Sequence, residues 1–400
     1  MSIFFHIDVN SAFLSWSALE QLENGSDVDI RTIPSIVGGD TQKRHGIVLA
    51  KSIPAKAYGI QTAEPVVNAF RKCPNLVMVS PNYTMYHERS QALMAHLSGI
   101  CPDIEQVSID ECYMDYTPIS NKYASPEIAA TQIKDSVYKT FGFTVNVGIS
   151  DRKVLAKMAS DFKKPNLVHT LYHSEIQTKL WPLPVSSLYM CGHSSVEALH
   201  KLGILTIGDL AKADLEILRS HLKSHGTTLW EYANGIDSSV VGAQPVKMKG
   251  IGNSITLIQD AETKEDAYHA LLSLAESVGS RVRADGVLAG MVSTEIKYAT
   301  FQSVSHQTTL DIPSDSTDTI YRTACKLFDE LWDGSPIRLL GIRTSKLVSN
   351  TEPTQLSLFD MQTASPQTEK HKKLDLALDA LRGKYGDDII KRGSLLSSPK

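Results

Sequence analysis

The first part of the chain, up to about residue 165, alternates between short apolar runs and segments with helical spacing. Residues 3 to 9 form an apolar run typical of a buried strand, so Asp8 is expected near the end of that strand. Residues 10 to 22 then place apolar side chains every three or four positions, which predicts a helix. A strand with a short helix is expected at 46 to 59, and a longer helix at 83 to 97. This alternation indicates an α/β or α+β body.

Two further segments complete this first body. Residues 144 to 150 alternate strictly between apolar and polar positions, which predicts a strand whose apolar side chains share one face. Residues 152 to 164 carry five Lys or Arg and a single acid, Asp161, opposite an apolar face. A solvated helix face and a surface that binds phosphate explain this charge run equally well.

A smaller helical module and a second mixed unit follow. Thr206 and Asp209 have the spacing of a helix capping box in the helical module, and residues 235 to 245 have the composition of a linker. The elements expected in the second unit are a helix at 263 to 284, strands at 291 to 298 and 303 to 310, and a helix at 317 to 332. The polar segment 349 to 370 is expected to be disordered outside one apolar pentapeptide.

Composition limits the function classes. The chain has 400 residues, 42% of them hydrophobic and 21% charged, so it can form more than one domain with its own core. A net charge of -4 excludes a uniformly basic nucleic-acid coat but permits a local basic groove. The five cysteines stand far apart without a C-x-x-C pair, which argues against a disulfide scaffold or structural zinc. No apolar run approaches the ~20 residues of a membrane span, so we expect a cytosolic protein.

Three carboxylates give the strongest chemical signal. Asp8 lies near the end of a predicted strand, and Asp110 and Glu111 lie in a β-rich run at 107 to 115. Oxygen ligands that converge from adjacent strands can hold two Mg²⁺ ions for phosphoryl transfer. Because neighbouring strand residues point to opposite faces, Glu111 needs a turn or bulge to join Asp110. On spacing alone, carboxylates that merely end strands in solvent are the alternative.

Four lysines are candidates for binding triphosphate oxygens beside these carboxylates: Lys51, Lys56, Lys163 and Lys164. A P-loop is excluded because the chain has no G-x-x-x-x-G-K-[ST] segment. Any nucleotide site would therefore depend on lysine point charges and metal ions.

Several ordered segments carry a family resemblance. They are Phe5 to Phe13, Gly46 to Ser52, Ala55 to Gly59, Ser108 to Glu111, Val147 to Ser150, Ala156 to Ala159, Lys164 to Asn166 and Gly252 to Ser254. In order and separation they resemble the bacterial Y-family translesion DNA polymerases, of the DNA polymerase IV and UmuC kind. The resemblance implies an α+β multidomain fold: a right-hand polymerase with a ferredoxin-like palm, small fingers, a helical thumb containing a helix-hairpin-helix, and an α/β little finger.

The resemblance also implies roles for single residues. Asp8 and Asp110 would bridge two Mg²⁺ ions, Glu111 would bind the metal at the primer 3′-OH, and the carbonyl oxygen of Val9 would complete the nucleotide-side metal. Phe13 falls on the family's steric gate, which excludes a ribose 2′-OH. An ordinary core phenylalanine in an amphipathic helix is the alternative for that position.

Other positions match the family less closely. Lys164 matches the lysine that reaches the β- and γ-phosphates, and Lys56 stands where many relatives have Arg. Ile53 replaces a tyrosine that binds triphosphate in the family, so the grip of the fingers on triphosphate is expected to be weaker. The Gly-x-Gly of the helix-hairpin-helix is replaced by Met190-Cys191-Gly192, which predicts a distorted turn and a weaker contact with a DNA phosphate at Gly192.

The resemblance divides the chain into parts. We expect palm and fingers at 1–166, with the fingers at about 11–78, and a thumb at 167–235. A linker at 236–250 would lead to a little finger at 251–347 and a tail at 348–400. Candidates for DNA contact in the little finger are Lys297, Arg338, Arg343 and Lys346, with plain surface solubility as the alternative for each.

The apolar pentapeptide of the tail, Gln355-Leu356-Ser357-Leu358-Phe359, resembles the peptide with which bacterial polymerases dock on the sliding clamp. Its apolar side chains have no core to join in a polar segment, and a partner pocket would bury each for about 1.5–3 kcal/mol before ordering costs. The alternative is a small patch that folds back on the chain.

The resemblance implies a low-fidelity, template-directed DNA polymerase for translesion synthesis, which uses dNTP, primer-template DNA, two Mg²⁺ ions and the sliding clamp. We expect a monomer in the bacterial cytoplasm, associated with the nucleoid and without membrane contact. One alternative is a catalytically weak Y-family relative that binds DNA and the clamp and acts as a recruitment factor. The other is a palm-type nucleotide cyclase, which would need neither residues 251–347 nor the clamp peptide.

Overall fold

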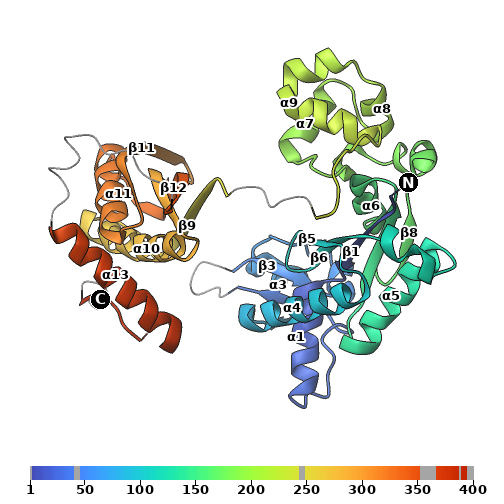
Figure 1. Cartoon of the computed structure of the whole chain (residues 1–400), viewed down its shortest axis with the longest axis horizontal. Helices are drawn as coiled ribbons and strands as arrows, with labels where there is room; N and C mark the ends of the chain where they lie inside the picture. The colour runs from blue at the N-terminus through green and yellow to red at the C-terminus, as the bar shows by residue number, and fades with distance from the viewer. Residues whose placement is uncertain (1, 40–45, 243–247, 352–365, 387–388, 394–400) are drawn as a thin grey trace. The chain divides into compact units, whose positions relative to one another are not determined.

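The structure is a computed structural model that describes residues 2–39, 46–242, 248–351, 366–386 and 389–393. These residues belong to two compact units, the first ending before the gap at residue 243 and the second beginning after it (Figure 1). Each unit has a hydrophobic core of its own. Within the described part of the chain, no helix combines the length and the apolar character needed to cross a membrane.

The main sheet of the first unit has five strands in the order β5-β6-β1-β7-β8. Its strands are β1 (Phe4–Val9), β5 (Ile104–Gln106), β6 (Glu111–Asp115), β7 (Val145–Ser150) and β8 (Val168–Thr170). The central strand β1 is antiparallel to both β6 and β7. The strand predicted at 3 to 9 is confirmed, and Asp8 lies next to its last residue.

Helices cover both faces of this sheet. On one face, side chains of α1 (Ala12–Glu23), α4 (Tyr83–Ile100) and α5 (Pro126–Phe141) share a core with Phe5, Ile7 and Val9 of β1. On the other face lies α6 (Lys153–Ser160), which packs against β1 and β7. The close approach of α6 requires Gly148 in β7, because a Cβ there would lie 2.0 Å from the carbonyl oxygen of Ala156.

The strand predicted at 144 to 150 is confirmed as β7, and its odd-numbered valines and isoleucine join the core as predicted. Because α6 covers its other face, all six residues of β7 are buried. Every residue of α6 is buried as well, including Lys153 and Lys157. A solvated helix face therefore does not explain the charges on α6.

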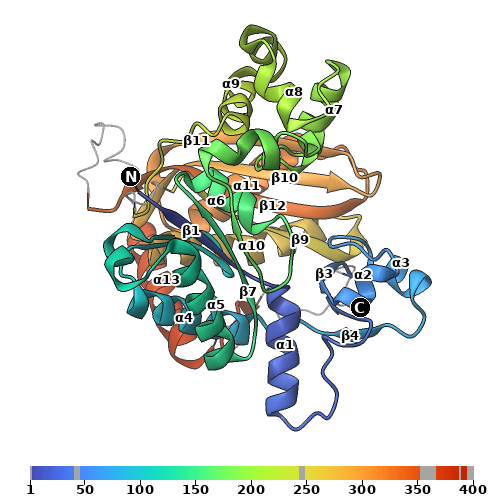
Figure 2. The same ribbon diagram turned by 90° about the vertical axis from the view of Figure 1, so that its right-hand side faces the viewer.

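Two smaller parts complete the first unit. A sheet in the order β3-β2-β4 contains β2 (Ser35–Gly38), β3 (Val48–Lys51) and β4 (Val77–Val79), and carries the short helices α2 (Ile53–Ala57) and α3 (Val66–Lys72). The helices α7 (His193–Lys201), α8 (Ile207–Lys212) and α9 (Leu215–Ala233) form a separate group in both Figure 1 and Figure 2. Their core includes apolar side chains of α6. The predicted capping box of Thr206 and Asp209 is confirmed at the start of α8.

The second unit has a four-stranded antiparallel sheet in the order β11-β10-β12-β9. Its strands are β9 (Gly250–Ala261), β10 (Val287–Tyr298), β11 (Ser303–Ser314) and β12 (Ile337–Ser349). The helices α10 (Lys264–Ala284) and α11 (Thr317–Leu331) pack against the sheet and confirm both helices predicted here. The strands β10 and β11 were predicted in part, whereas β9 and β12 were not.

A last helix, α13 (Pro366–Tyr385), corrects the sequence prediction for the polar segment 349 to 370. Its first residues fall inside the stretch that was predicted to be disordered. Charged side chains hold α13 to α10: Arg283 pairs with Asp379 at 2.6 Å, and Glu276 pairs with Arg382 at 3.1 Å. The end of the described chain is thus an ordered part of the second unit.

Candidate active site

Two carboxylates face each other across strands β1 and β6. In the antiparallel register Asp8 is the direct partner of Glu111. The alternation along β1 sends Phe5, Ile7 and Val9 into the core, so Asp8 lies on the face that α6 covers. Only 5% of Asp8 is exposed to solvent. Burial raises the pKa of Asp8, an effect that the positive charge of Lys164 opposes.

Two ammonium groups neutralise these carboxylates. Lys164 donates to Oδ2 of Asp8, and Lys157 on α6 lies 2.9 Å from Oε2 of Glu111 and 3.9 Å from Oδ2 of Asp8. Asp161 accepts from Lys164 at 2.9 Å and lies 3.6 Å from Lys157. Burial lowers the pKa of each lysine, but the surrounding carboxylates outweigh it and raise both pKa values above the ordinary range. Both lysines are therefore charged at neutral pH.

Glu111 has a second partner on β1. The Nε2 atom of His6 lies 3.2 Å from Oε2 of Glu111. This hydrogen bond has the largest effect on the pKa of Glu111 and lowers it. Burial acts in the opposite direction, but the Lys157 ammonium also lowers the pKa, which falls to about 2. Glu111 is therefore ionised throughout the physiological range.

Asp110 joins the other two carboxylates through a turn. It immediately precedes β6, so it does not alternate with Glu111 as two strand residues would. Its carbonyl oxygen accepts from the backbone N–H of Val9 at 3.1 Å, and Ser108 donates to its Oδ1 at 2.7 Å. The turn that sequence reasoning required is thus present, and the three residues lie at one end of the paired strands β1 and β6.

The comparisons with known proteins decide the family. The family model described as impB/mucB/samB matches residues 7–161, and the model of its C-terminal domain matches residues 248–358. DNA polymerase IV of Clostridium acetobutylicum is 45% identical over 394 residues, which cover 98% of each chain. DNA polymerase IV 1 of Bacillus subtilis is 36% identical over 397 residues, 98% of this chain and 93% of that protein.

The chain belongs to the impB/mucB/samB family and is a bacterial Y-family DNA polymerase. A solved structure agrees at the level of the fold. The Y-family DNA polymerase chimera Dbh-Dpo4-Dbh superimposes with a TM-score of 0.74 at 20% identity, covering 87% of this chain and all of that one. This Y-family polymerase is therefore a DNA-directed DNA polymerase of the kind that carries out translesion synthesis, in an α+β right-hand fold.

The donor set fits a divalent metal, which Y-family polymerases generally use. Asp8, Asp110 and Glu111 supply only hard oxygen ligands, the type that Mg²⁺ prefers. Among the residues that the structure describes, no three His, Cys, Asp or Glu side chains already stand close enough to form a metal cage. The ammonium groups of Lys157 and Lys164 supply positive charge at the same oxygens. A metal cation would take the place of these ammonium groups at the carboxylate oxygens. The three carboxylates therefore suit a metal ion chemically, although they do not already form a cage for one.

Two predicted nucleotide-site residues lie on helices of the first unit. Phe13 on α1 is half-buried and stacks on Tyr86, with ring centroids 4.5 Å apart and an interplanar angle of 15°. Lys56 is exposed on α2. The pKa of Lys51 is lowered mainly by the burial of Lys51 itself and, to a smaller extent, by the positive charge of Lys56. Ile53 begins α2 with 64% of its surface exposed, so it offers no hydrogen-bond donor at a position open to solvent. Among the described residues, no hydrogen bond or ion pair joins Lys56 to the three carboxylates, and the ring contacts of Phe13 are with Trp16, Tyr83 and Tyr86.

The altered hairpin of the thumb is formed, but at a strained position. Met190, which stands where the family has its first glycine, has a φ of 69° in the left-handed region. The turn still closes, because Gly192 donates to the carbonyl oxygen of Met190 at 3.1 Å and then caps α7. The sequence predicted a distorted turn, and the structure places the strain in the backbone of one residue.

The little-finger candidates fall at different places on the sheet. Lys297 and Arg338 lie over the ring of Phe301, at 5.3 Å and 4.8 Å from its centroid. Phe301 sits in the turn between β10 and β11 with 62% of its surface exposed. Arg343 is exposed on β12, and Lys346 donates to Thr309 at 3.1 Å. The clamp peptide, Gln355 to Phe359, lies outside the described residues.

Sequence reasoning missed three residues of the site: His6, Lys157 and Ser160. A signal was available for each, because strand alternation places His6 on the same face as Asp8, and positions 157 and 160 share a face of a helix. The segments containing His6 and Lys157 were noted for the family resemblance, whereas Ser160 lies just beyond them, and the burial of all three could not be seen without the packing of α6.

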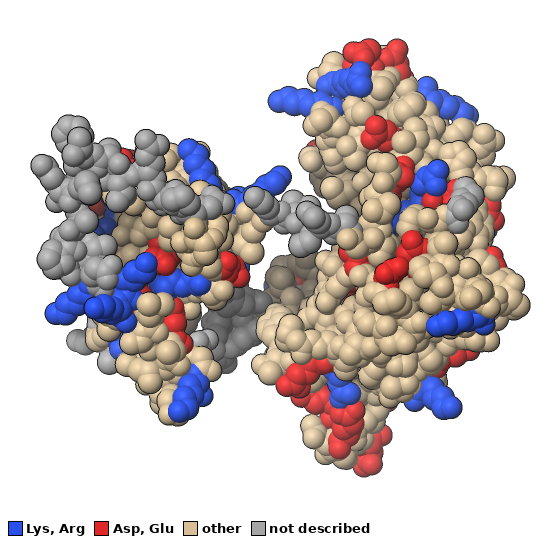
Figure 3. All heavy atoms as spheres, in the orientation of Figure 1, with Lys and Arg blue, Asp and Glu red and all other residues tan. Residues whose placement is uncertain are grey.

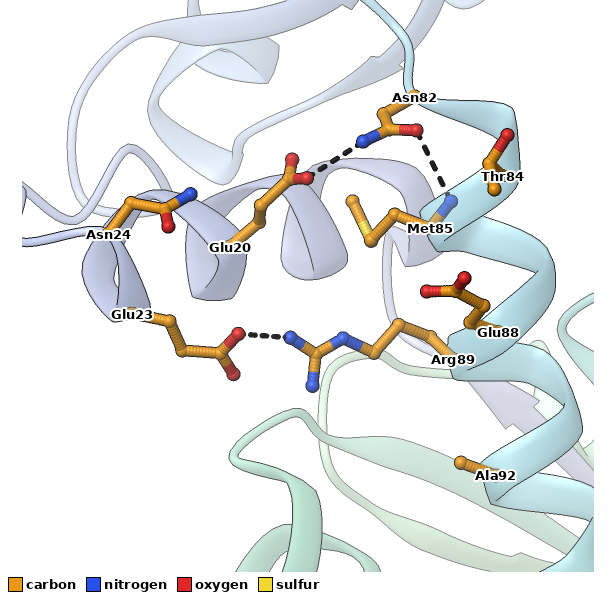
Figure 4. A pocket seen from close by; sticks show the side chains of 9 residues that line it. All are labelled: Glu20, Glu23, Asn24, Asn82, Thr84, Met85, Glu88, Arg89 and Ala92. Carbon is orange, nitrogen blue, oxygen red and sulfur yellow. Dashed lines mark hydrogen bonds and ion pairs between the residues drawn. The ribbon is translucent and has the colours of Figure 1, made fainter.

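A separate hollow of about 520 Å³ lies between α1 and α4 (Figure 4). Asn82 donates to Glu20 at 2.7 Å, and Arg89 pairs with Glu23 across it. Acidic side chains gather at this end of the first unit in Figure 3. None of the predicted site residues lines the hollow, and an acidic rim does not suit nucleotide phosphates.

Proposed function

We propose that Asp8, Asp110 and Glu111 bind two Mg²⁺ ions and that the protein transfers a nucleotide from a dNTP to a primer 3′-OH with low fidelity. The observation that carries the proposal is the cross-strand pair of Asp8 and Glu111, with Asp110 tied to β1 by its backbone and the ammonium groups of Lys157 and Lys164 at the oxygens of that pair. When bound, the metals would stabilise charge on the attacking and leaving oxygens. The carbonyl oxygen of Val9 would be a further ligand.

The protein's own groups have defined tasks in this proposal. Lys164 has a second carboxylate partner in Asp161, so it stays in the site when a cation replaces it at Asp8. Its ammonium would then reach the β- and γ-phosphates of the dNTP, with Lys56 as a second point charge. Phe13 would lie beneath the sugar and exclude a 2′-OH.

Primer extension tests the function directly. With Mg²⁺, four dNTPs and a primed template, the wild-type protein should extend the primer and Asp110→Ala should not. Asp115→Asn is a matched control, because Asp115 lies at the other end of strand β6 from Glu111 and its side chain accepts from the backbone N–H of Thr117 at 2.8 Å. Extension by Asp110→Ala at the wild-type rate would remove the proposed metal site.

The domain boundaries also belong to this proposal. The boundaries are palm and fingers at 1–166, a thumb at 167–235, a linker at 236–250 and a little finger at 251–347, and the separate cores of the two units support the start of the little finger. The cores do not separate palm from thumb at residue 166, because the core of the helical group includes side chains of α6 and β8 pairs with β7 in the main sheet. The thumb would hold a DNA phosphate through the backbone at Gly192. The protein would act as a monomer in the bacterial cytoplasm, at the nucleoid.

In the little finger, Lys297, Arg338 and Arg343 would bind the backbone of primer-template DNA. Contacts of this kind weaken with salt, by a slope of ~0.9 per phosphate in a plot of log affinity against log salt. Replacing Arg343 by Gln should therefore reduce the salt slope of DNA binding, and an unchanged slope would exclude the contact.

In the tail, Gln355, Leu356, Leu358 and Phe359 would dock on the bacterial sliding clamp, as the resemblance of this peptide suggests. Deleting residues 355–359 should abolish stimulation of synthesis by the clamp and leave basal synthesis unchanged. Stimulation that survives the deletion would show that the clamp binds elsewhere.

A further inference from the structure

His6 lies behind the carboxylates, and the reaction outlined above gives it no task. Its side chain is completely buried in the middle of β1, on the face that α6 covers. Its Nδ1 atom lies 2.8 Å from Oγ of Ser160, and its Nε2 atom lies 3.2 Å from Oε2 of Glu111. The ring of Tyr113 packs against it at a centroid distance of 4.8 Å. Both ring nitrogens therefore have protein partners, and the partner of Nε2, Glu111, is a proposed metal ligand.

The partners of the His6 ring fix its position on both sides. A carboxylate that binds a metal is ionised and can only accept, so Nε2 of His6 is the donor to Glu111 when a metal is bound. On the other side of the ring, Oγ of Ser160 lies 2.8 Å from Nδ1 and donates to the carbonyl oxygen of Lys157 at 2.8 Å. Ser160 therefore ties the ring to the backbone of α6.

We infer that His6 and Ser160 are positioning residues: Ser160 holds the imidazole of His6 in place, and Nε2 of His6 holds the Glu111 carboxylate in the orientation in which it binds metal. The inference rests on the proposed metal-binding role of Glu111. Lys157 holds the same oxygen, but its ammonium competes with a metal for the negative charge, whereas His6 is held in place by Ser160.

Hydrogen-bond partners of metal ligands affect metal affinity by about 10- to 100-fold when they are removed. Two His6 variants separate the donor from the mere presence of a polar side chain. In His6→Gln the amide nitrogen reaches the position of Nε2 and can donate to Glu111, whereas in His6→Asn it reaches only the position of Nδ1. Ser160→Ala removes the hydroxyl that holds Nδ1 of the His6 ring.

The test is Mn²⁺ binding to the full chain, measured by electron paramagnetic resonance, alongside the thermal unfolding midpoint. His6→Asn and Ser160→Ala should bind Mn²⁺ about 10-fold more weakly, and His6→Gln should retain most of the affinity. The matched control is Ser90→Ala, because Ser90 is a buried serine of the same unit whose hydroxyl accepts from Gln106 at 3.1 Å. It should bind Mn²⁺ as the wild type does at a comparable loss of stability.

The outcomes are distinguishable. Wild-type Mn²⁺ affinity in His6→Asn and Ser160→Ala, with weak binding by Glu111→Gln, would overturn the inference and leave the proposed site intact. Wild-type affinity in Glu111→Gln would overturn both. Equal weakening in His6→Gln and His6→Asn would also overturn the inference, because the Nε2 donor would then be irrelevant. If His6→Asn fails to fold, Ser160→Ala decides.

Discussion

Asp8 on β1 is the direct antiparallel partner of Glu111 on β6, and the register brings both side chains to one ammonium group, that of Lys157. Two carboxylates at adjacent positions would otherwise repel each other, and the charge of each would favour protonation of the other. The ammonium groups of the buried Lys157 and the exposed Lys164 offset this repulsion. The two carboxylates are therefore held at one end of the paired strands by the protein's own charges.

The steric gate is tested by removing the ring of Phe13. Phe13 stacks on Tyr86, so its position is fixed by packing. Phe13→Ala should raise the incorporation of ribonucleotides relative to deoxyribonucleotides by about 10- to 100-fold, because a steric block of one hydroxyl is removed. The measurement is the ratio of kcat/KM for a rNTP and its dNTP, with Phe13→Tyr as the control that keeps a ring. Unchanged sugar selectivity in Phe13→Ala would mean that Phe13 is only a packing residue.

The strained turn of the thumb is tested at Met190. A residue with a Cβ pays about 1–2 kcal/mol in the left-handed conformation, while a glycine costs about 0.5–1 kcal/mol in conformational entropy on folding. Met190→Gly should therefore stabilise the protein by up to about 1 kcal/mol, measured by urea unfolding. Gly192→Ala is the control, because Gly192 has a φ of -74° and a Cβ there would meet nothing within 4 Å. Destabilisation by Met190→Gly would contradict the strain argument.

The ion pairs of α13 are expected to stabilise the fold of the second unit. Asp375 on α13 is 3% exposed, accepts from the backbone N–H of Thr317 at 2.9 Å and thereby caps α11, whose own N-cap residue makes no side-chain bond. It also pairs with Arg283 at 3.4 Å and with Arg392 at 3.2 Å. Removing one partner of a buried pair costs about 3–5 kcal/mol because the other charge stays buried.

Arg283→Met should therefore increase hydrogen exchange in α10 and α11, measured by mass spectrometry of the full chain. Lys264→Met is the matched control on the same helix, because the pair of Lys264 and Asp329 is largely exposed and is expected to contribute about 0–1 kcal/mol. Equal protection in both variants would mean that α13 does not stabilise the unit.

Local patterns predicted much of the site, and tertiary packing decided the rest. The apolar run of β1 placed Asp8 at a strand end. Because neighbouring strand residues point to opposite faces of a sheet, Asp110 and Glu111 could converge only if a turn came between them, and Asp110 occupies that turn. The burial of α6 could not be predicted, because the lysines on it suit water until the carboxylates of β1 and β6 are placed beside them. Strand β9 was missed because most of its residues are exposed or half-buried at a sheet edge, so no strict alternation of apolar and polar positions marks it.

The central claim is that the three carboxylates are the metal site of a DNA polymerase. Its most direct test is the rate of single-nucleotide incorporation with Mg²⁺ under single-turnover conditions. Asp8→Asn and Glu111→Gln, which keep size and polarity, should each lose several kcal/mol of transition-state stabilisation, a fall of about 10³-fold in rate. Asp115→Asn should incorporate at the wild-type rate. Incorporation by Asp8→Asn and Glu111→Gln at the rate of Asp115→Asn would contradict the account.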